Sequence, residues 1–225
     1  MAGLQVHTAE TAYAVTQAEI KAWCKIDSSD DDSAVALIER TVHNWAKEYT
    51  KRTLTTVTYN LFIDAVYDLD IRLQEGMYVG IDRNINRKSI LLPKSPVASV
   101  THIKSYDDSD NATTFASTKY YVDIASIPAR VVLRNGEAYP TSLRVANGLE
   151  IRYVAGYGAT TAVPYDIKSA CLEYASYLFE HRGDLMNGAR VLAPTSATQL
   201  LDPYVIRTLS KHPYRGMSHY GGMFG

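Results

Sequence analysis

The sequence has little cysteine, little net charge and no long hydrophobic run, and each shortage excludes a class of protein. Two cysteines among 225 residues are too few for a disulfide-built fold, so a reducing compartment fits. A formal net charge of −1 provides no overall field that would draw the chain to nucleic acid or to an anionic membrane. No apolar stretch approaches the roughly 20 residues that a membrane-spanning helix needs.

A secretory signal is also missing from the first residues, MAGLQVHTAETAY, which have neither a basic start nor an apolar core. We therefore expect the protein to be made and folded in a cytoplasm. Phenylalanine is scarce as well, with 4 residues against 17 tyrosines. Tyrosine has an apolar body and a polar tip, so it suits half-buried strands and wet interfaces.

Helical periodicity predicts three helices, at about residues 16–25, 30–52 and 164–182. Thr16 and Glu19 form a capping-box pattern at the first start, and Pro164 suits the first position of the third helix. Apolar residues then recur every three or four positions and give each longer helix one buried face. These residues are Val35, Ile38, Val42, Trp45 and Tyr49 in the second helix, and Ile167, Cys171, Tyr174 and Leu178 in the third.

Between the helices the hydrophobic period changes to two, which indicates strands. In YDLDIRLQ, residues 67–74, apolar side chains alternate with polar ones such as Asp68 and Asp70. Further strands are expected at about 88–92, 97–106, 119–124, 130–134 and 149–155. The pattern predicts an α+β protein in which an antiparallel β barrel or sandwich is inserted into a helical layer. The expected divisions are 1–52, an N-terminal arm and helices; 53–158, the β domain; 159–184, a helix packing on the first two; and 185–225, an extended tail.

The last strand and the third helix meet at a corner, residues 149–184. Alternation places Ile151 in the core and turns Glu150 and Arg152 toward water. Gly156 and Gly158 follow, where the backbone has to bend. No catalytic group accompanies this corner, so its role is expected to be structural.

Candidate chemistry is sparse along the whole chain. The DDSDN stretch, residues 107–111, lacks the glycine and the bidentate glutamate of a calcium loop and suits a hairpin tip. His43 and His181 have no second ligand one turn away, and Cys24 and Cys171 fall on apolar helix faces. We therefore expect no catalytic, cofactor-binding or metal-binding residues, and no enzyme. A thiol enzyme would require a cysteine that titrates well below about 8.5.

The order of several short motifs resembles one family. The motifs are ILLPKSPVASV, then PARVVL, then YVAGYG followed by VPYDI and a helix, with LLDPYVIR near the end. In this order they are similar to the head–tail connector (adaptor, or head-completion) proteins of tailed bacteriophages, over about residues 30–184, and LLDPYVIR is similar to the tail of that family. The resemblance implies a ring in the virion neck, usually of twelve subunits, made in the host bacterial cytoplasm. It implies binding to the portal protein and to the next neck or tail protein. Double-stranded DNA would pass through the ring without specific binding.

Two groups of residues are candidates for these contacts. After residue 185 periodicity is lost, so we expect a tail that is disordered in the free subunit and becomes ordered on the portal. Its expected docking residues are Leu200, Leu201, Tyr204, Val205, Ile206, Arg207, Lys211, Tyr214 and Arg215. Asp68 and Asp70 are candidates for a channel lining, because a basic lumen would bind phosphates and retard DNA. A solvated outer face accounts for these two aspartates equally well.

An alternative function is a ligand-binding or glycan-binding β module of a phage tail. The tyrosine excess and the succession of short strands favour it. Tyrosines gathered on one exposed β face would support this alternative, whereas tyrosines buried in the core would not.

Overall fold

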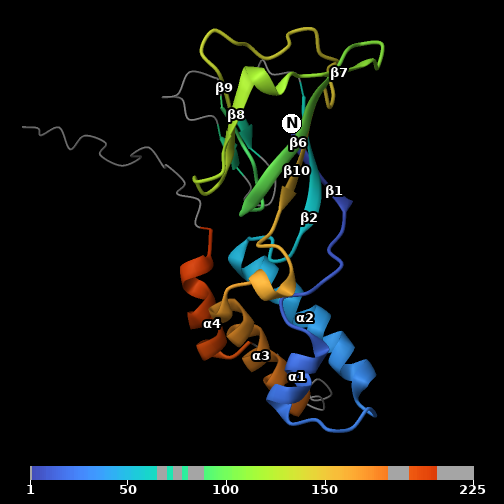
Figure 1. The fold of residues 1–225 in the computed structure, drawn as a ribbon, viewed down its shortest axis with the longest axis vertical. Coiled ribbons are helices and arrows are strands. Elements are labelled where there is room, and N and C mark those ends of the chain that lie inside the picture. The colour runs from blue at the N-terminus through green and yellow to red at the C-terminus, as the bar shows by residue number, and fades with distance from the viewer. Residues whose placement is uncertain (1, 65–69, 73–77, 81–88, 182–192, 207–225) are drawn as a thin grey trace, which may run out of the picture.

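The computed structural model describes residues 2–64, 70–72, 78–80, 89–181 and 193–206, and these form a β layer above a helical layer (Figure 1). The helical layer holds α1 (Gln17–Cys24), α2 (Asp32–Thr50), α3 (Tyr165–Glu180) and α4 (Thr195–Leu201). The strands are β1 (Ala2–Thr8), β2 (Val57–Ile63), β3 (Asp70–Arg72), β4 (Tyr78–Gly80), β5 (Ser89–Leu91), β6 (Val97–Tyr106), β7 (Ala112–Thr114), β8 (Tyr120–Asp123), β9 (Arg130–Leu133) and β10 (Leu149–Ala155). Short 3-10 turns lie at η1 (Ser117–Lys119), η2 (Thr160–Ala162) and η4 (Asp202–Tyr204).

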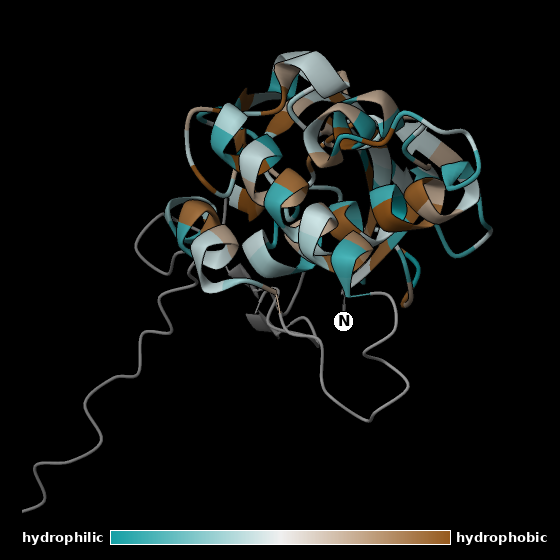
Figure 2. Cartoon of the chain, turned by 90° about the horizontal axis from the view of Figure 1, so that it is seen from below, coloured by the Kyte–Doolittle hydropathy of each residue, from teal (hydrophilic) through white to brown (hydrophobic). Residues whose placement is uncertain are grey.

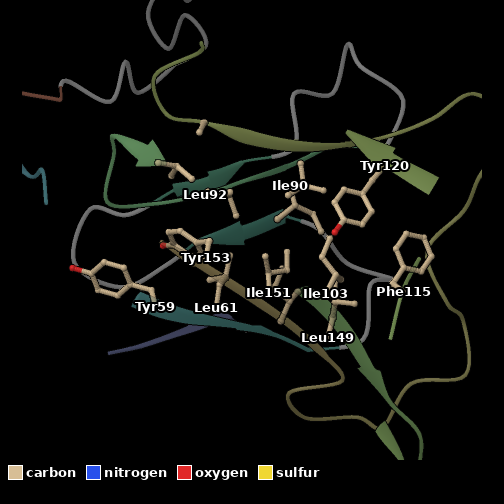
Figure 3. Packing of buried hydrophobic residues seen from close by; sticks show 14 of the residues in the cluster. Tyr59, Leu61, Ile90, Leu92, Ile103, Phe115, Tyr120, Leu149, Ile151 and Tyr153 are labelled. Atoms are coloured by element: carbon tan, nitrogen blue, oxygen red, sulfur yellow. The ribbon is translucent and has the colours of Figure 1, made fainter. Parts of the chain in front are cut away.

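The strands form two facing sheets and one hairpin, all antiparallel. One sheet has the order β1-β2-β10-β6-β7, the other has the order β5-β9-β8, and β3 pairs with β4. Between the two larger sheets, Leu61, Ile103 and Ile151 of the first sheet share one hydrophobic core with Ile90 of the second and with Leu92, which follows β5 (Figure 3). The α+β class and the sandwich-like β layer are therefore confirmed, and the described strands do not close into a barrel.

The helical layer has a hydrophobic core of its own, to which all four helices contribute. Hydrophobic and hydrophilic residues alternate along these helices (Figure 2), as the amphipathic spacing predicted. At the start of α1, Thr16 Oγ1 accepts a hydrogen bond from Glu19 N at 3.2 Å, and Glu19 Oε2 accepts one from Thr16 N at 2.8 Å. The predicted capping box is thus confirmed. Pro164 precedes α3 as its N-cap, one position before the predicted one.

The first residues form an edge strand, whereas sequence pattern had indicated only an arm. Strand β1 pairs with β2 from Ala2 opposite Ile63 to Thr8 opposite Thr58. Residues of β1 are largely exposed, so no clear alternation of polar and apolar side chains marks the strand in the sequence. The chain therefore begins in the β layer and then crosses to the helices.

Candidate assembly surface

The corner between β10 and α3 is fixed by backbone contacts to the residues just before β6 and just before β2. Gly156 N donates to Pro96 O at 2.8 Å, and Gly158 O accepts from Thr56 N at 3.1 Å. Both glycines have positive φ, +116° and +124°. A Cβ at Gly156 would lie 2.2 Å from Thr55 O, so only glycine fits. The predicted bend is confirmed, and it connects the β layer to the helical layer at a defined angle.

A second connection between the layers, residues 9–16, is held by a buried histidine. His43 Nδ1 on α2 accepts a hydrogen bond from Ala14 N at 3.0 Å, and the His43 side chain is fully buried. Its Nε2 lies 3.5 Å from Glu10 Oε1, which also pairs with Lys47 at 2.6 Å. Burial and the Lys47 charge lower the pKa of His43 to about 4, against the opposing attraction of Glu10. The imidazole is therefore neutral near pH 7 and acts as an acceptor for the connection.

The outer face of the five-stranded sheet contains a polar network that sequence reasoning missed. Glu150 was expected to face water, but it is buried, and its Oε2 accepts a hydrogen bond from Tyr106 at 2.5 Å. Its Oε1 lies 3.3 Å from both His102 Nε2 and Arg152 Nη2. Burial alone would raise the pKa of Glu150, but the hydrogen bonds from Tyr106 and His102 and the Arg152 charge outweigh it and lower this pKa. The carboxylate therefore stays ionised and ties β6 to β10.

The C-terminal segment up to residue 206 packs on the helical layer. Ala197 and Leu201 of α4 are fully buried there, whereas Leu200 is 36% exposed. The expectation of a tail that is disordered in the free subunit is wrong for residues 195–206, which pack on the helices. Helix α4 begins after Pro194 and is amphipathic, but at 7 residues it is too short for a clear periodic pattern.

Side-chain hydrogen bonds fasten this segment to the two longest helices. Tyr49 on α2 donates its hydroxyl to Asp202 Oδ1 at 2.6 Å. Tyr204, one of the predicted docking residues, donates its hydroxyl to Asp166 Oδ2 on α3 at 2.9 Å. The 3-10 turn η4 is thus held between α2 and α3.

Two contacts fix the path of the chain just after this turn. Arg52 Nε donates to Tyr204 O at 2.5 Å, and Ile206 N donates to Thr50 O at 3.0 Å. Val205 and Ile206 are half-buried beside the C-terminal end of α2. The chain therefore leaves the helical layer at the side that faces the β layer (Figure 1).

The other predicted contact residues are only partly covered by the structure. Arg207, Lys211, Tyr214 and Arg215 lie outside the described residues, as does Asp68. Asp70 is the first residue of β3, which pairs with β4. The structure brings Leu200, Leu201, Tyr204, Val205 and Ile206 together in one segment.

Neither cysteine is an activated thiol. Burial raises the pKa of Cys171 to about 12, and its Sγ lies 3.8 Å from Val42 O in the helical core. Burial also raises the pKa of Cys24. Among the described residues no group of three or more acidic, histidine or cysteine side chains could hold a metal ion. In the same part of the chain, no helix is both long and apolar enough to span a bilayer.

Several apolar side chains remain exposed on the described surface. Trp23 on α1 is 53% exposed, and Leu37 on α2 is 67% exposed. At the far end of the β layer, Ile124 and Ile127 are more than half exposed, and Val145 is 84% exposed. Isolated apolar residues on a surface are common, so their arrangement on particular faces matters more than their presence.

Comparison with solved structures places this fold. Neither a protein-family model nor a curated protein matches the sequence. A chain in the virion of a native gene transfer agent (GTA) particle matches with a TM-score of 0.68 and 20% identity, over 93% of this chain and 99% of that chain. A chain in the neck of the empty GTA particle, computed with C6 symmetry, matches with a TM-score of 0.67 and 21% identity, over 94% and 100%. A chain in the neck of the native particle, computed with C12 symmetry, matches with a TM-score of 0.64 and 21% identity, over 94% of this chain and 100% of that chain. The protein thus has the fold of a chain found in virion and neck structures.

Proposed function

We propose that this protein is a structural component of the neck of a tailed phage or phage-like particle. In this proposal it is a head–tail connector that forms a ring beneath the portal and extends the DNA channel. The ring also offers a platform to the next neck or tail protein. The observation that carries the proposal is the shared fold, which extends over nearly the full length of both this chain and the neck chains.

A ring of identical subunits agrees with the symmetry of those neck structures. They were computed with C6 and C12 symmetry, which supports a cyclic arrangement here, with twelve copies as the proposed number. A ring closes only if every subunit holds its neighbours at the same angle. The corner at Gly156 and the connection pinned by His43 would supply this rigidity, because they join the two layers at two separate places.

The C-terminal residues are the proposed contact to the portal. The segment from Leu200 to Ile206 directs the chain out of the helical layer, and residues 207–225 would continue onto the portal protein. Arg207, Lys211 and Arg215 would pair with carboxylates there, while Tyr214 would supply an aromatic anchor. Asp68 and Asp70 stay the candidates for an acidic channel lining, which a lysine-lined lumen would contradict.

Burial of the tyrosines gives no support to a glycan-binding β module. Tyr59, Tyr120, Tyr139 and Tyr153 lie in the core between the sheets, and Tyr174 lies in the helical core. Among the described tyrosines, the two exposed ones are Tyr121 on β8 and Tyr165 at the start of α3, so they do not gather on one β face.

Deleting the gene from a phage that carries it tests the proposal. We expect DNA-filled heads and separate tails that do not join, and we expect the protein itself to be detected by mass spectrometry in purified wild-type particles. Normal tailed particles assembled without the protein would contradict the proposed function.

A further inference from the structure

The helical layer has two outer faces, formed by different helices on opposite sides. On α2, the buried residues Val35, Ile38 and Val42 face α3, and Cys171 Sγ of α3 lies 3.8 Å from Val42 O. Leu37 and Arg40 are exposed and point to the opposite side of α2, since helix positions recur every 3.6 residues.

The second face is formed by α3 together with α1. On α3, the buried residues Ile167, Ala170 and Tyr174 face inward, which turns Glu173 and Glu180 outward. Helix α1 borders this face, because Cys24 has a side-chain hydrogen bond with Ser176 and feels the charge of Glu180. The exposed Trp23 is the neighbour of Cys24.

The two faces complement each other in charge and in apolar groups. The α2 face combines exposed Leu37 with the cation Arg40, and the α1/α3 face combines exposed Trp23 with the carboxylate of Glu173. Within the described ranges, no ion pair joins Arg40 or Glu173 to another residue of the chain. An interface between different faces of one chain is heterologous, and repeating it with a closing rotation generates a ring.

The residues of the two faces also lie at similar heights along the helix axes. Rotation about a ring axis leaves the height of a residue along that axis unchanged, so residues that meet across the interface share one level. Helices α2 and α3 run in opposite directions (Figure 1), with Cys171 Sγ 3.8 Å from Val42 O and the rings of Trp45 and Tyr174 4.8 Å apart. These two contacts place Arg40 and Leu37 level with the second half of α3, which contains Glu173 and Ser176, and Ser176 contacts Cys24 beside Trp23.

We propose that a second copy of this chain docks through these faces, so that Leu37 and Arg40 of one subunit contact Trp23 and Glu173 of the next. The helical layer stands along the ring axis in this arrangement. The inference rests on the proposed ring function and names the surface that closes the ring. The opposed charges fix the register, and the apolar pair at the same level contributes buried area.

Disulfide trapping tests the contact, because it captures neighbours even when they associate transiently. In a Cys24→Ser background, the full-length Trp23→Cys/Leu37→Cys variant is oxidised at high concentration and resolved under denaturing conditions. We expect a ladder of covalent oligomers, since every subunit carries both halves of the contact. A mixture of the two single-cysteine variants should stop at dimers. Oxidation of the double variant to dimers only, or to no product, would overturn the proposed interface.

A charge exchange gives an independent readout by mass photometry or analytical ultracentrifugation of the same full-length protein. Arg40→Glu and Glu173→Arg should each weaken self-association about tenfold or more, through like-charge repulsion. The Arg40→Glu/Glu173→Arg double variant should recover it. Arg134→Glu, an exposed arginine on the β layer, and Val145→Ser, an exposed apolar residue, are matched controls that should leave assembly unchanged.

The two proposals fail in different ways. Single variants that assemble as well as wild type, or a double variant no better than the singles, would overturn the interface and leave the neck function standing. Absence of the protein from particles would overturn the neck function, whatever oligomers the purified chain forms.

Discussion

At the scale of single residues, the connection between the layers depends on His43, whose pKa is lowered by folding. His43 is neutral in the folded protein down to a pKa of about 4, compared with an ordinary value of 6.5. The unfolded chain therefore binds more protons between these two values. The free energy of unfolding must fall as the pH decreases through this window, because proton binding favours the state with the higher pKa.

We predict a loss of about 3 kcal/mol of stability between pH 6.5 and pH 4 from His43, at roughly 1.4 kcal/mol per pKa unit. Denaturant unfolding at several pH values measures this slope. His43→Gln should flatten the slope in that window, whereas His7→Gln, at an exposed position on β1, should not. An unchanged slope in His43→Gln would show that another group carries the pH dependence.

The two glycines at the corner should respond differently to substitution. At Gly156 an added Cβ would lie 2.2 Å from Thr55 O, whereas at Gly158 its nearest neighbour would be Ala162 Cβ at 3.4 Å. Both positions also have positive φ, which strains any L-residue. We therefore expect Gly158→Ala to cost about 1–2 kcal/mol and Gly156→Ala to cost clearly more. Equal melting temperatures of the two variants would contradict the close contact at Gly156.

At the scale of secondary structure, helix α4 is expected to stabilise the helical layer through one residue. Leu201 is fully buried, so Leu201→Ala should lower the free energy of unfolding by about 2–5 kcal/mol. Leu200 is its matched control, since it is 36% exposed and Leu200→Ala should change stability by only about 0.5 kcal/mol. Similar stabilities of the two variants would show that α4 does not pack as described.

Truncation separates the packed part of the C-terminal segment from the proposed docking part. Removing residues 207–225 leaves every described contact in place, so melting should stay near the wild-type value while attachment to portal-bearing heads is lost. Removing residues 200–225 also takes away Leu201 and Tyr204, and this variant should melt at a lower temperature. If the variant that lacks residues 207–225 still completes heads normally, the tail is not the docking element.

Most elements that sequence predicted have a clear hydrophobic period, and the short helix α1 and short strands β5, β8 and β9 were predicted from a capping box, alternation and turn signals. Helices α2 and α3 and strands β6 and β10 have one face that is mostly buried, so the spacing of their apolar residues reports their type and extent. Strand β1 is an exposed edge, and β7 has three exposed residues, so neither has a hydrophobic pattern that sequence alone could reveal.

The polar contacts of the site could not be predicted from the sequence for a different reason. Glu150 alternates as a solvent-facing residue should, and only the pairing of β10 with β6 brings His102 and Tyr106 over it. The hydrogen bonds of Tyr49 and Arg52 to η4 join residues about 150 positions apart in the chain. Contacts of this kind depend on register and tertiary packing, which local periodicity does not encode.

At the scale of the whole molecule, two cores are joined by rigid connections, and each layer has a separate role in the proposed assembly. The helical layer would provide the ring contacts through α2 and the α1/α3 face, and the chain leaving it at Ile206 would reach the portal. The β layer, held by the corner at Gly156, would stand at a fixed angle to this ring. Both proposed roles require that the protein lies in the neck of the particle.

A cryo-electron microscopy reconstruction of the neck of purified particles would locate the protein. We expect a ring of copies with this fold directly beneath the portal and around the DNA channel, with α2 of each subunit against α3 of the next. Density for the chain elsewhere in the particle, or a neck built without it, would show that the protein is not the proposed connector.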